Sequence, residues 1–156
     1  MGNDIPLAAL IGLLVILLLL SAFFSGSETA LMSLNRYKLR HKARAGHRGA
    51  RLAESLLARP DRLIGLILLG NNAVNLLAAS LVTIISLRLG GEQAIWIGTM
   101  ILTFVILIFA EITPKTIAAL QPEKIAFPAS VVLNLLMKVL FPLVLMVNSS
   151  VGDFRL

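Results

Sequence analysis

Polar side chains of the kinds that bind hard metal ions occur at three places within long apolar runs. They belong to the segments Ser-Gly-Ser-Glu at 25–28, Gly-Asn-Asn-Ala-Val-Asn at 70–75 and Phe-Ala-Glu-Ile-Thr-Pro-Lys at 109–115. Hydroxyl, amide and carboxylate oxygens suit Mg²⁺ or Na⁺ and suit Zn²⁺ or Cu²⁺ poorly. The chain has no cysteine, and both histidines lie outside the apolar runs, so we expect an all-oxygen site.

The first segment has two interpretations. Ser25 followed three residues later by Glu28 fits a capping box, in which one helix ends near Phe24 and another begins. Alternatively, Gly26 lets the backbone turn, which would leave carbonyl oxygens unpaired beside the hydroxyls of Ser25 and Ser27. Both interpretations predict an interruption of the helix at this point.

The second segment places three asparagines in five residues. Asn71 and Asn75 are four residues apart and Asn72 and Asn75 three apart, so a helix would project them from one broad face. A single asparagine in a membrane helix most often forms an interhelical hydrogen bond. Three together favour a polar cavity.

The third segment contains a carboxylate, Glu111, after seventeen residues without a charge. An intramembrane carboxylate is a candidate functional group, and the alternative is an ion pair with Lys115 one helical turn later. Pro114 has no N–H and crowds the carbonyl four residues earlier. We therefore expect a free carbonyl oxygen at Ala110, beside Glu111.

The helices that must position these groups follow from the composition. The chain has 156 residues, of which 58% are hydrophobic. About twenty apolar residues cross the hydrocarbon core of a membrane as a helix. The sequence predicts an all-α membrane protein, a single transmembrane domain over 1–156 with spans at about 5–24, 62–88 and 93–118 and juxtamembrane segments at 28–60 and 124–150.

Charge distribution predicts the topology. Nine of the fourteen basic residues fall between Arg36 and Arg62, and positive charge in a short loop marks the cytoplasmic side. The amino terminus and the Gly90-Gly91 turn are therefore expected outside. We interpret the net charge of +6 as a topology signal and a contact with lipid headgroups, with no nucleic acid as partner.

The segment 28–60 should lie near the inner membrane face, with Leu39 and Leu56 against lipid and interruptions at Gly46 and Gly49. The run 125–147 is ambiguous from pattern alone. Its length favours crossing, whereas its polar and proline residues favour a bent helix at the inner interface; these are Pro128, Asn134, Lys138 and Pro142.

Depth links the three polar segments. At about 1.5 Å per residue, the serines, the asparagines and Glu111 can all reach the inner half of the membrane. A subunit with only three spans has little interior in which to bury them, so we expect a homodimer with one site in each protomer. Small residues suited to close helix approach are Gly65, Gly70, Ala73, Ala78, Ala79 and Gly98.

The motifs SGSETAL, GNN and EITPK, in this order, resemble the transmembrane domain of the CorB/CorC and cyclin M magnesium transporters. The resemblance runs from about Leu7 to the carboxyl end. It implies a three-span homodimer in the cell (inner) membrane and Mg²⁺ transport, proposed in several members as Na⁺-coupled export. By motif position, it implies an ion site of Ser25, Ser27, Asn72 and Glu111, with Asn71 and Asn75 as further candidates.

The same resemblance implies cytoplasmic domains of the cystathionine-β-synthase type after the membrane domain, which this chain does not contain. A cytoplasmic continuation requires a carboxyl terminus inside, so it favours a belt-like interfacial helix at 124–150.

Two functions remain open at this point, a Mg²⁺ transporter and a membrane-embedded Mg²⁺ sensor that moves no ion itself. An enzyme is not expected, because the sequence has no HExxH motif and no histidine within a span that would activate a serine.

Overall fold

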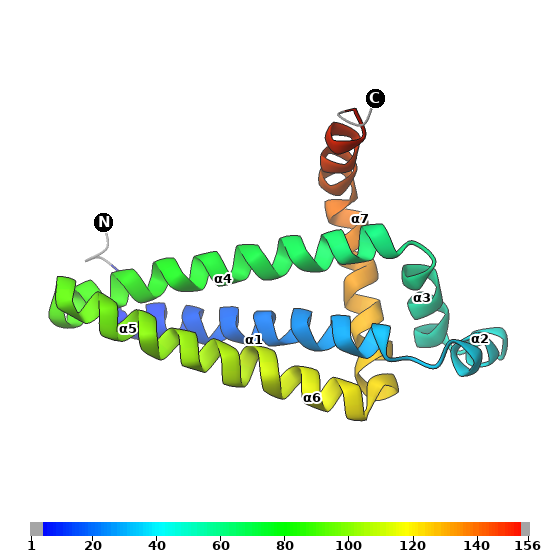
Figure 1. The fold of residues 1–156 in the computed structure, drawn as a ribbon, viewed down its shortest axis with the longest axis horizontal. Helices are drawn as coiled ribbons and strands as arrows, with labels where there is room; N and C mark the ends of the chain where they lie inside the picture. Colours follow the sequence, from blue (N-terminus) through cyan, green and yellow to red (C-terminus); the bar gives the residue numbers. More distant parts are fainter. Residues whose placement is uncertain (1–4, 154–156) are drawn as a thin grey trace. The chain divides into compact units, whose positions relative to one another are not determined.

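The computed structural model describes residues 5–153, and the described part contains helices and no strand (Figure 1). The predicted domain limits, 1 and 156, lie outside the described residues. Three helical stretches are long and apolar enough to cross a membrane: α1 (Leu7–Met32), α4 (Pro60–Gly90) and Glu92–Leu120. The last consists of α5 (Glu92–Val105), η1 (Ile106–Ile112) and α6 (Thr113–Leu120). The predicted all-α class with three spans is confirmed.

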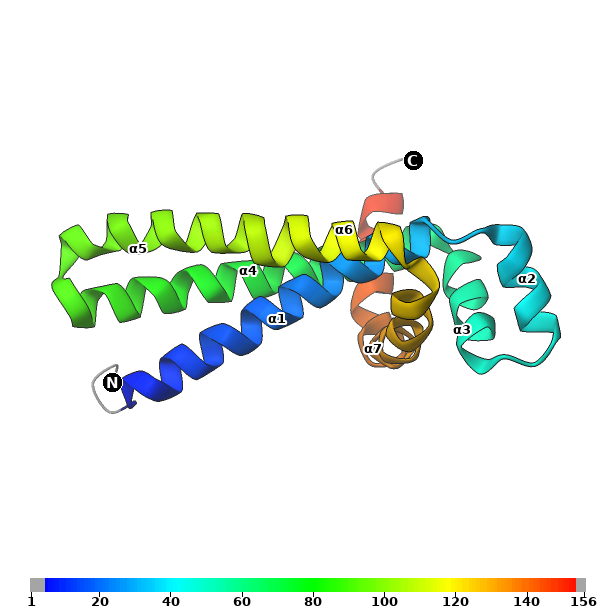
Figure 2. The same ribbon diagram turned by 90° about the horizontal axis from the view of Figure 1, so that it is seen from below.

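The helices form two compact units, residues 5–26 with 70–117 and residues 27–69 with 118–153. Within the first unit, α1 and α5 run in one direction and α4 in the other (Figures 1 and 2). The turn between α4 and α5 lies at the predicted Gly90-Gly91 position, where Gly91 has a φ of 75°. L side chains rarely adopt this backbone conformation, so glycine is the residue that permits the reversal.

The expected interruption at Ser-Gly-Ser-Glu is wrong. α1 continues through Ser25, Gly26, Ser27 and Glu28 to Met32, so Ser25 caps no helix. In a membrane the helix satisfies its own backbone hydrogen bonds, which outweighs the cost of about 1 kcal/mol that glycine adds in a helix interior.

The second unit contains two short helices, α2 (Arg36–Arg44) and α3 (Arg48–Leu57). Asn35 caps α2 by accepting hydrogen bonds from the N–H groups of Tyr37 and Lys38, and His47 caps α3 through the N–H of Ala50. The predicted break at Gly46 is confirmed by its φ of 97° between the two helices.

The predicted break at Gly49 is wrong, because this residue lies inside α3. A Cβ atom there would stand 2.8 Å from Cβ of Phe127 on α7 (Pro122–Asp153). Glycine therefore allows α3 to pack closely against α7.

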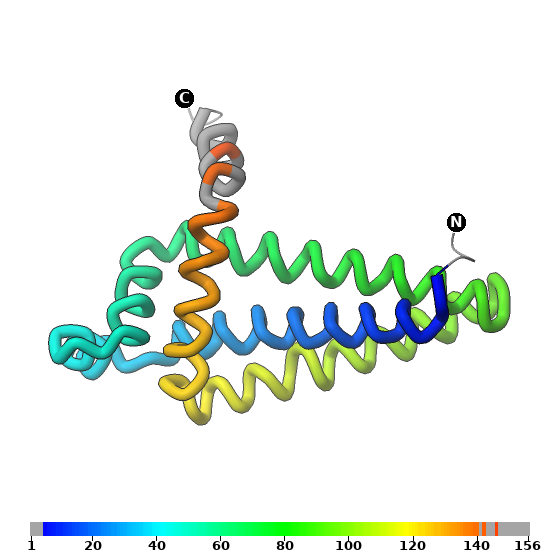
Figure 3. The backbone as a smooth tube through the Cα atoms, turned by 180° about the vertical axis from the view of Figure 1, so that it is seen from behind, coloured from blue at the N-terminus to red at the C-terminus, as the bar shows by residue number. Residues whose placement is uncertain are grey.

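The apolar side chains of α2 and α3 do not face lipid as expected. Leu39 and Leu56 are buried within the described protein, at 3% and 6% exposure. Lys42 also joins α2 to α7 through an ion pair with Glu123, with 2.7 Å between Nζ and Oε2. The short helices are thus packed parts of this unit (Figure 3).

α7 is one helix through both Pro128 and Pro142. Within its unit it passes across the first turns of α4 (Figures 1 and 3). Whether it lies in the membrane interface stays a prediction.

Candidate metal centre

A hydroxyl on α1 bonds to two of the predicted asparagines on α4. Oγ of Ser21 lies 2.8 Å from Oδ1 of Asn75 and 3.1 Å from Oδ1 of Asn71. Ser21 is fully buried, and both asparagines are partly buried. Because a hydroxyl has one proton, it donates to one amide oxygen at a time and leaves the other with free acceptor capacity.

Ser25 lies one helical turn after Ser21 and is also buried, at 2% exposure. Residues four apart in a helix share a face, so Ser25 continues the face on which Ser21 meets α4. Ser27 is two residues further on and projects about 200° away around the continuous helix. Its Oγ is buried and has no hydrogen-bond partner among the described residues.

Asn72 differs from its two neighbours. It is exposed in the single chain, whereas Asn71 and Asn75 are partly buried. Successive residues are rotated by about 100° on a helix, which turns Asn72 away from the face that carries the other two. The structure thus brings Asn71 and Asn75 to α1 and leaves Asn72 on another face of α4.

The helix that carries Glu111 departs from regular α geometry. η1 is a π-helix, and the N–H of Thr113 bonds to the carbonyl of Ile108, five residues earlier. In a π-helix each N–H bonds to the carbonyl five residues earlier. The carbonyl that lacks a donor because Pro114 has no N–H is therefore that of Phe109, and not that of Ala110. The expectation of a free carbonyl at Ala110 assumed an α register, and the π-helix shifts it by one residue.

Pro114 and Gly26 bring α1 and α6 close together. A Cβ atom on Gly26 would lie 3.5 Å from Cβ of Pro114, and 3.6 Å from its carbonyl oxygen. Glycine thus leaves this side of α1 free of a side chain. Glu111 precedes Pro114 by three residues, or about 4.5 Å along the helix axis, which sets it level with the turn from Ser21 to Ser25.

Glu111 forms the ion pair that the sequence offered as an alternative. Its Oε2 lies 3.3 Å from Nζ of Lys115, and the two side chains are 25% and 48% exposed. The second carboxylate oxygen retains its acceptor capacity, and a half-exposed lysine can move away without leaving a buried charge. The ion pair therefore does not prevent Glu111 from binding a cation.

Taken together, residues 21–26 of α1 contact the asparagines of α4 and the proline of α6 at one level of the first unit. The groups at this level are hydroxyl and amide oxygens, with Glu111 three residues before the proline. This donor set fits a hard cation such as Mg²⁺.

Two features of this region are absent from the sequence interpretation. Ser21 was counted as part of an apolar run, although its position one turn before Ser25 on the same helix face is a usable signal. The π-helix has a weaker signal, a proline three residues after Glu111.

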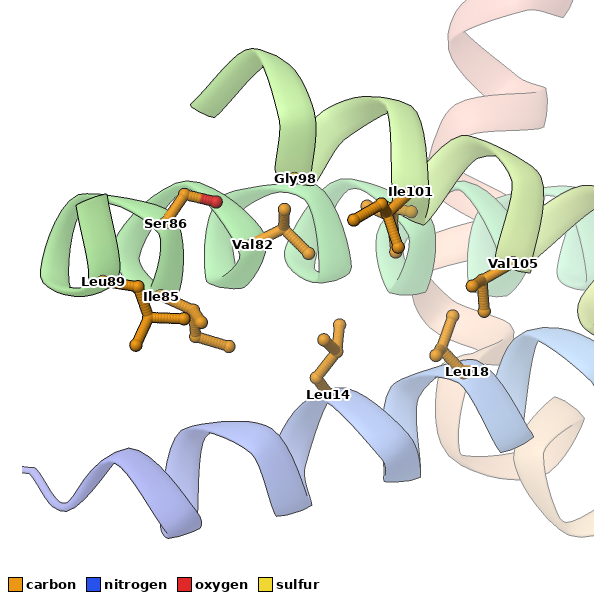
Figure 4. Close-up of a pocket in the computed structure, with 10 residues that line it drawn as sticks. Leu14, Leu18, Val82, Ile85, Ser86, Leu89, Gly98, Ile101 and Val105 are labelled. Atoms are coloured by element: carbon orange, nitrogen blue, oxygen red, sulfur yellow. The ribbon is translucent and has the colours of Figure 1, made fainter. Parts of the chain in front are cut away.

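The first unit also contains an apolar cavity of about 240 Å³ between α1, α4 and α5 (Figure 4). Leu14, Val82 and Ile101 are among the side chains that line it, and Ser86 supplies a single hydroxyl. None of the candidate ligands lines this cavity, and a cation would find almost no oxygen there.

Comparison with known proteins agrees with the helices and the motifs. The chain is 55% identical over 130 residues to the UPF0053 inner membrane protein YfjD of Escherichia coli K12, which covers 83% of this chain and 30% of that protein. It is 49% identical over 146 residues to a UPF0053 protein of Haemophilus influenzae, covering 94% of this chain and 35% of the relative. A chloroplastic DUF21 domain-containing protein of Arabidopsis thaliana is 34% identical over 114 residues, which is 73% of this chain and 17% of that protein.

The chain thus spans about a third of the length of the two bacterial relatives. Residues 12–154 match the family described as the cyclin M transmembrane N-terminal domain. With three helices able to cross a membrane, the chain is a multi-pass membrane protein and belongs to the cyclin M transmembrane domain family.

Proposed function

We propose that this protein moves Mg²⁺ across the cell (inner) membrane through an all-oxygen site on its three spans. One observation carries the proposal most directly: within residues 21–26 of α1, Ser21 bonds to the asparagines of α4 and Gly26 lies beside Pro114, three residues after Glu111. The resemblance of the motifs to magnesium transporters supports the choice of ion.

The proposed ligands are Ser25, Asn71, Asn75 and Glu111, with Ser27 and Asn72 as further candidates. Ser27 is a candidate ligand because its buried Oγ has no hydrogen-bond partner among the described residues, and a bound cation would supply one. A local unwinding of α1 would be needed to turn the hydroxyls of Ser25 and Ser27 towards the same ion, since they point about 200° apart in the regular helix.

Glu111 supplies the charge that attracts the ion, and the neutral oxygens replace part of its hydration shell. Mg²⁺ gives up water reluctantly, so a site with one carboxylate holds it weakly enough for release. We propose export with possible coupling to Na⁺ as the direction of transport, following the family resemblance.

The decisive experiment is a Mg²⁺ flux assay with purified protein in liposomes, with and without an imposed Na⁺ gradient. Wild-type protein should produce flux above empty liposomes, and Glu111→Ala should abolish it. A dependence on the Na⁺ gradient would support coupling. Absence of flux from protein that still binds Mg²⁺ would favour the alternative function, a sensor that does not transport.

Binding is measured separately by thermal unfolding. Mg²⁺ should raise the melting temperature of the wild type, because a ligand that binds only the native state stabilises it. Ser25→Ala, Asn75→Ala and Glu111→Ala should each reduce this shift. An unchanged shift in all three variants would contradict the proposed site.

A further inference from the structure

A polar cavity lies in the unit formed by residues 27–69 and 118–153, and none of the residues proposed to bind Mg²⁺ lines it. Its volume is about 260 Å³. Three elements contribute to it: α3 with the residues that follow it, the first turn of α4, and α7. The lining residues are Ser55, Leu56, Arg59, Arg62, Asn134 and Met137.

The cavity combines positive charge with hydrogen-bonding groups. Arg59 directly precedes α4 and Arg62 lies in its first turn, while Asn134 lines the cavity from an otherwise apolar part of α7. Lys138 follows Asn134 by one helical turn and is exposed, but it is not among the lining residues. Among the described residues, the lining contains neither aspartate nor glutamate.

This set of groups matches the chemistry of a phosphate. Guanidinium groups bind phosphate oxygens through two parallel hydrogen bonds, and the hydroxyl and amide donors can complete the contact. Asn134 and Lys138 are unusual in an apolar run, and the cation site leaves them without a role. A phosphate in this cavity would give Asn134 a partner.

The two helices that line the cavity also carry exposed apolar side chains on their other faces: Ile64 (37%) and Leu68 (49%) on α4, and Leu135 (63%) and Val139 (67%) on α7. In a membrane protein such side chains are covered by hydrocarbon. A ligand with a phosphate beside acyl chains fits both surfaces, whereas a free phosphate fits the cavity alone.

We propose that this cavity binds the phosphate of an anionic phospholipid, held by Arg59 and Arg62 with Asn134. The lipid would tie α7 to the start of α4. It would thereby stabilise the packing of this unit independently of Mg²⁺ binding.

The test is thermal unfolding of the purified protein in a neutral detergent, with added phosphatidylglycerol or phosphatidylcholine. Phosphatidylglycerol should raise the melting temperature of the wild type by about 3 to 6 °C, and phosphatidylcholine by much less. Arg59→Gln and Asn134→Leu should each at least halve this shift, whereas Arg59→Lys, which keeps the charge but loses the two parallel hydrogen bonds, should give an intermediate shift. Retained phosphatidylglycerol counted by native mass spectrometry should fall in the same order.

The matched control is Arg48→Gln, which removes the same charge from an exposed position of α3 outside the cavity. It should keep the full shift. Equal shifts with both lipids, or an equal loss in the control, would overturn the proposal. A full shift with millimolar inorganic phosphate alone would assign the cavity to a free anion and overturn the lipid.

Discussion

Oγ of Ser21 lies 2.8 Å from Oδ1 of Asn75, and this hydrogen bond joins a buried position of one membrane span to a partly buried position of another. It fixes the rotation of α1 relative to α4 within the first unit. It also fixes which asparagines face the α1 serines, because Asn71 shares the same hydroxyl at 3.1 Å. Ser21 therefore positions the asparagine side chains that we assign to the cation site.

Removing the Ser21 hydroxyl should loosen this contact. Ser21→Ala leaves two partly buried amides without their shared partner, which costs about 1 to 2 kcal/mol. We expect a lower melting temperature in detergent and a smaller Mg²⁺-induced shift, while Ser21→Thr retains both. Ser80→Ala, at an exposed position of α4, is the control and should behave as wild type. A normal Mg²⁺ shift in Ser21→Ala would show that Ser21 does not position the asparagines.

The ion pair between Glu111 and Lys115 should be dispensable for binding. If the carboxylate binds the cation, Lys115→Met keeps measurable Mg²⁺ binding, while Glu111→Gln loses most of it. Calorimetric titration of purified protein with Mg²⁺ measures both. The reverse ranking would mean that the ion pair, 3.3 Å between Nζ and Oε2, is the main role of Glu111.

Gly49 should tolerate alanine poorly even though it lies in a helix. Alanine normally stabilises a helix interior by about 1 kcal/mol relative to glycine. At Gly49, however, the new methyl group would stand 2.8 Å from Cβ of Phe127, an atom held by its backbone. We expect Gly49→Ala to lower the melting temperature, with overpacking of the order of 1 to 3 kcal/mol.

The control for this prediction is Gly12→Ala. A Cβ atom at Gly12 has nothing within 4 Å, so the substitution should be neutral or stabilising. Equal melting temperatures for the two variants would show that α3 and α7 do not pack as closely as the structure indicates.

Most of the fold could be predicted from the lengths of the apolar runs and from the positions of glycines. Runs of about twenty uncharged residues placed the three spans, and the Gly90-Gly91 pair placed the turn. The predicted break at Gly26 is wrong because a membrane helix satisfies its own backbone hydrogen bonds and tolerates glycine. A Cβ built on Gly26 would meet Pro114 at an ordinary contact distance of 3.5 Å, so this position does not require glycine for packing.

The sequence predicts which residue types could form the site, but it does not predict how they are arranged in space. Spacing put three asparagines on one broad face, yet packing turns Asn71 and Asn75 to Ser21 and leaves Asn72 exposed. The small residues expected at a dimer interface show the same effect. Gly70 accommodates the ring of Phe24 and Gly98 accommodates Ser86, both within this chain.

The placement of α7 can be tested on the cysteine-free background of this chain. We predict that α7 does not cross the membrane, so Asp153→Cys and Gln121→Cys should react with an impermeant maleimide only after the inner face is exposed. Gln93→Cys, beside the turn predicted outside, should react in intact cells. Labelling of Asp153→Cys from outside would show that α7 crosses.

We predict that the protein forms a homodimer through an exposed face of α4. Asn72, Leu76 and Ala79 are exposed and follow one another at intervals of four and three residues, so they share one face of a membrane span. An amide exposed to lipid is costly, and a two-fold partner that presents the same face would give Asn72 a hydrogen-bonding partner.

Mass measurement in detergent should give two protomers, and Mg²⁺ titration should give two ions per dimer. Ala79→Leu should shift the mass towards the monomer because it fills the close approach on this face. Leu19→Phe, which enlarges an exposed side chain of α1, is the control and should remain dimeric. A monomeric wild type would contradict the dimer. A dimer with one ion would place the site on the symmetry axis, and Asn72 would then be the asparagine that reaches it from each protomer.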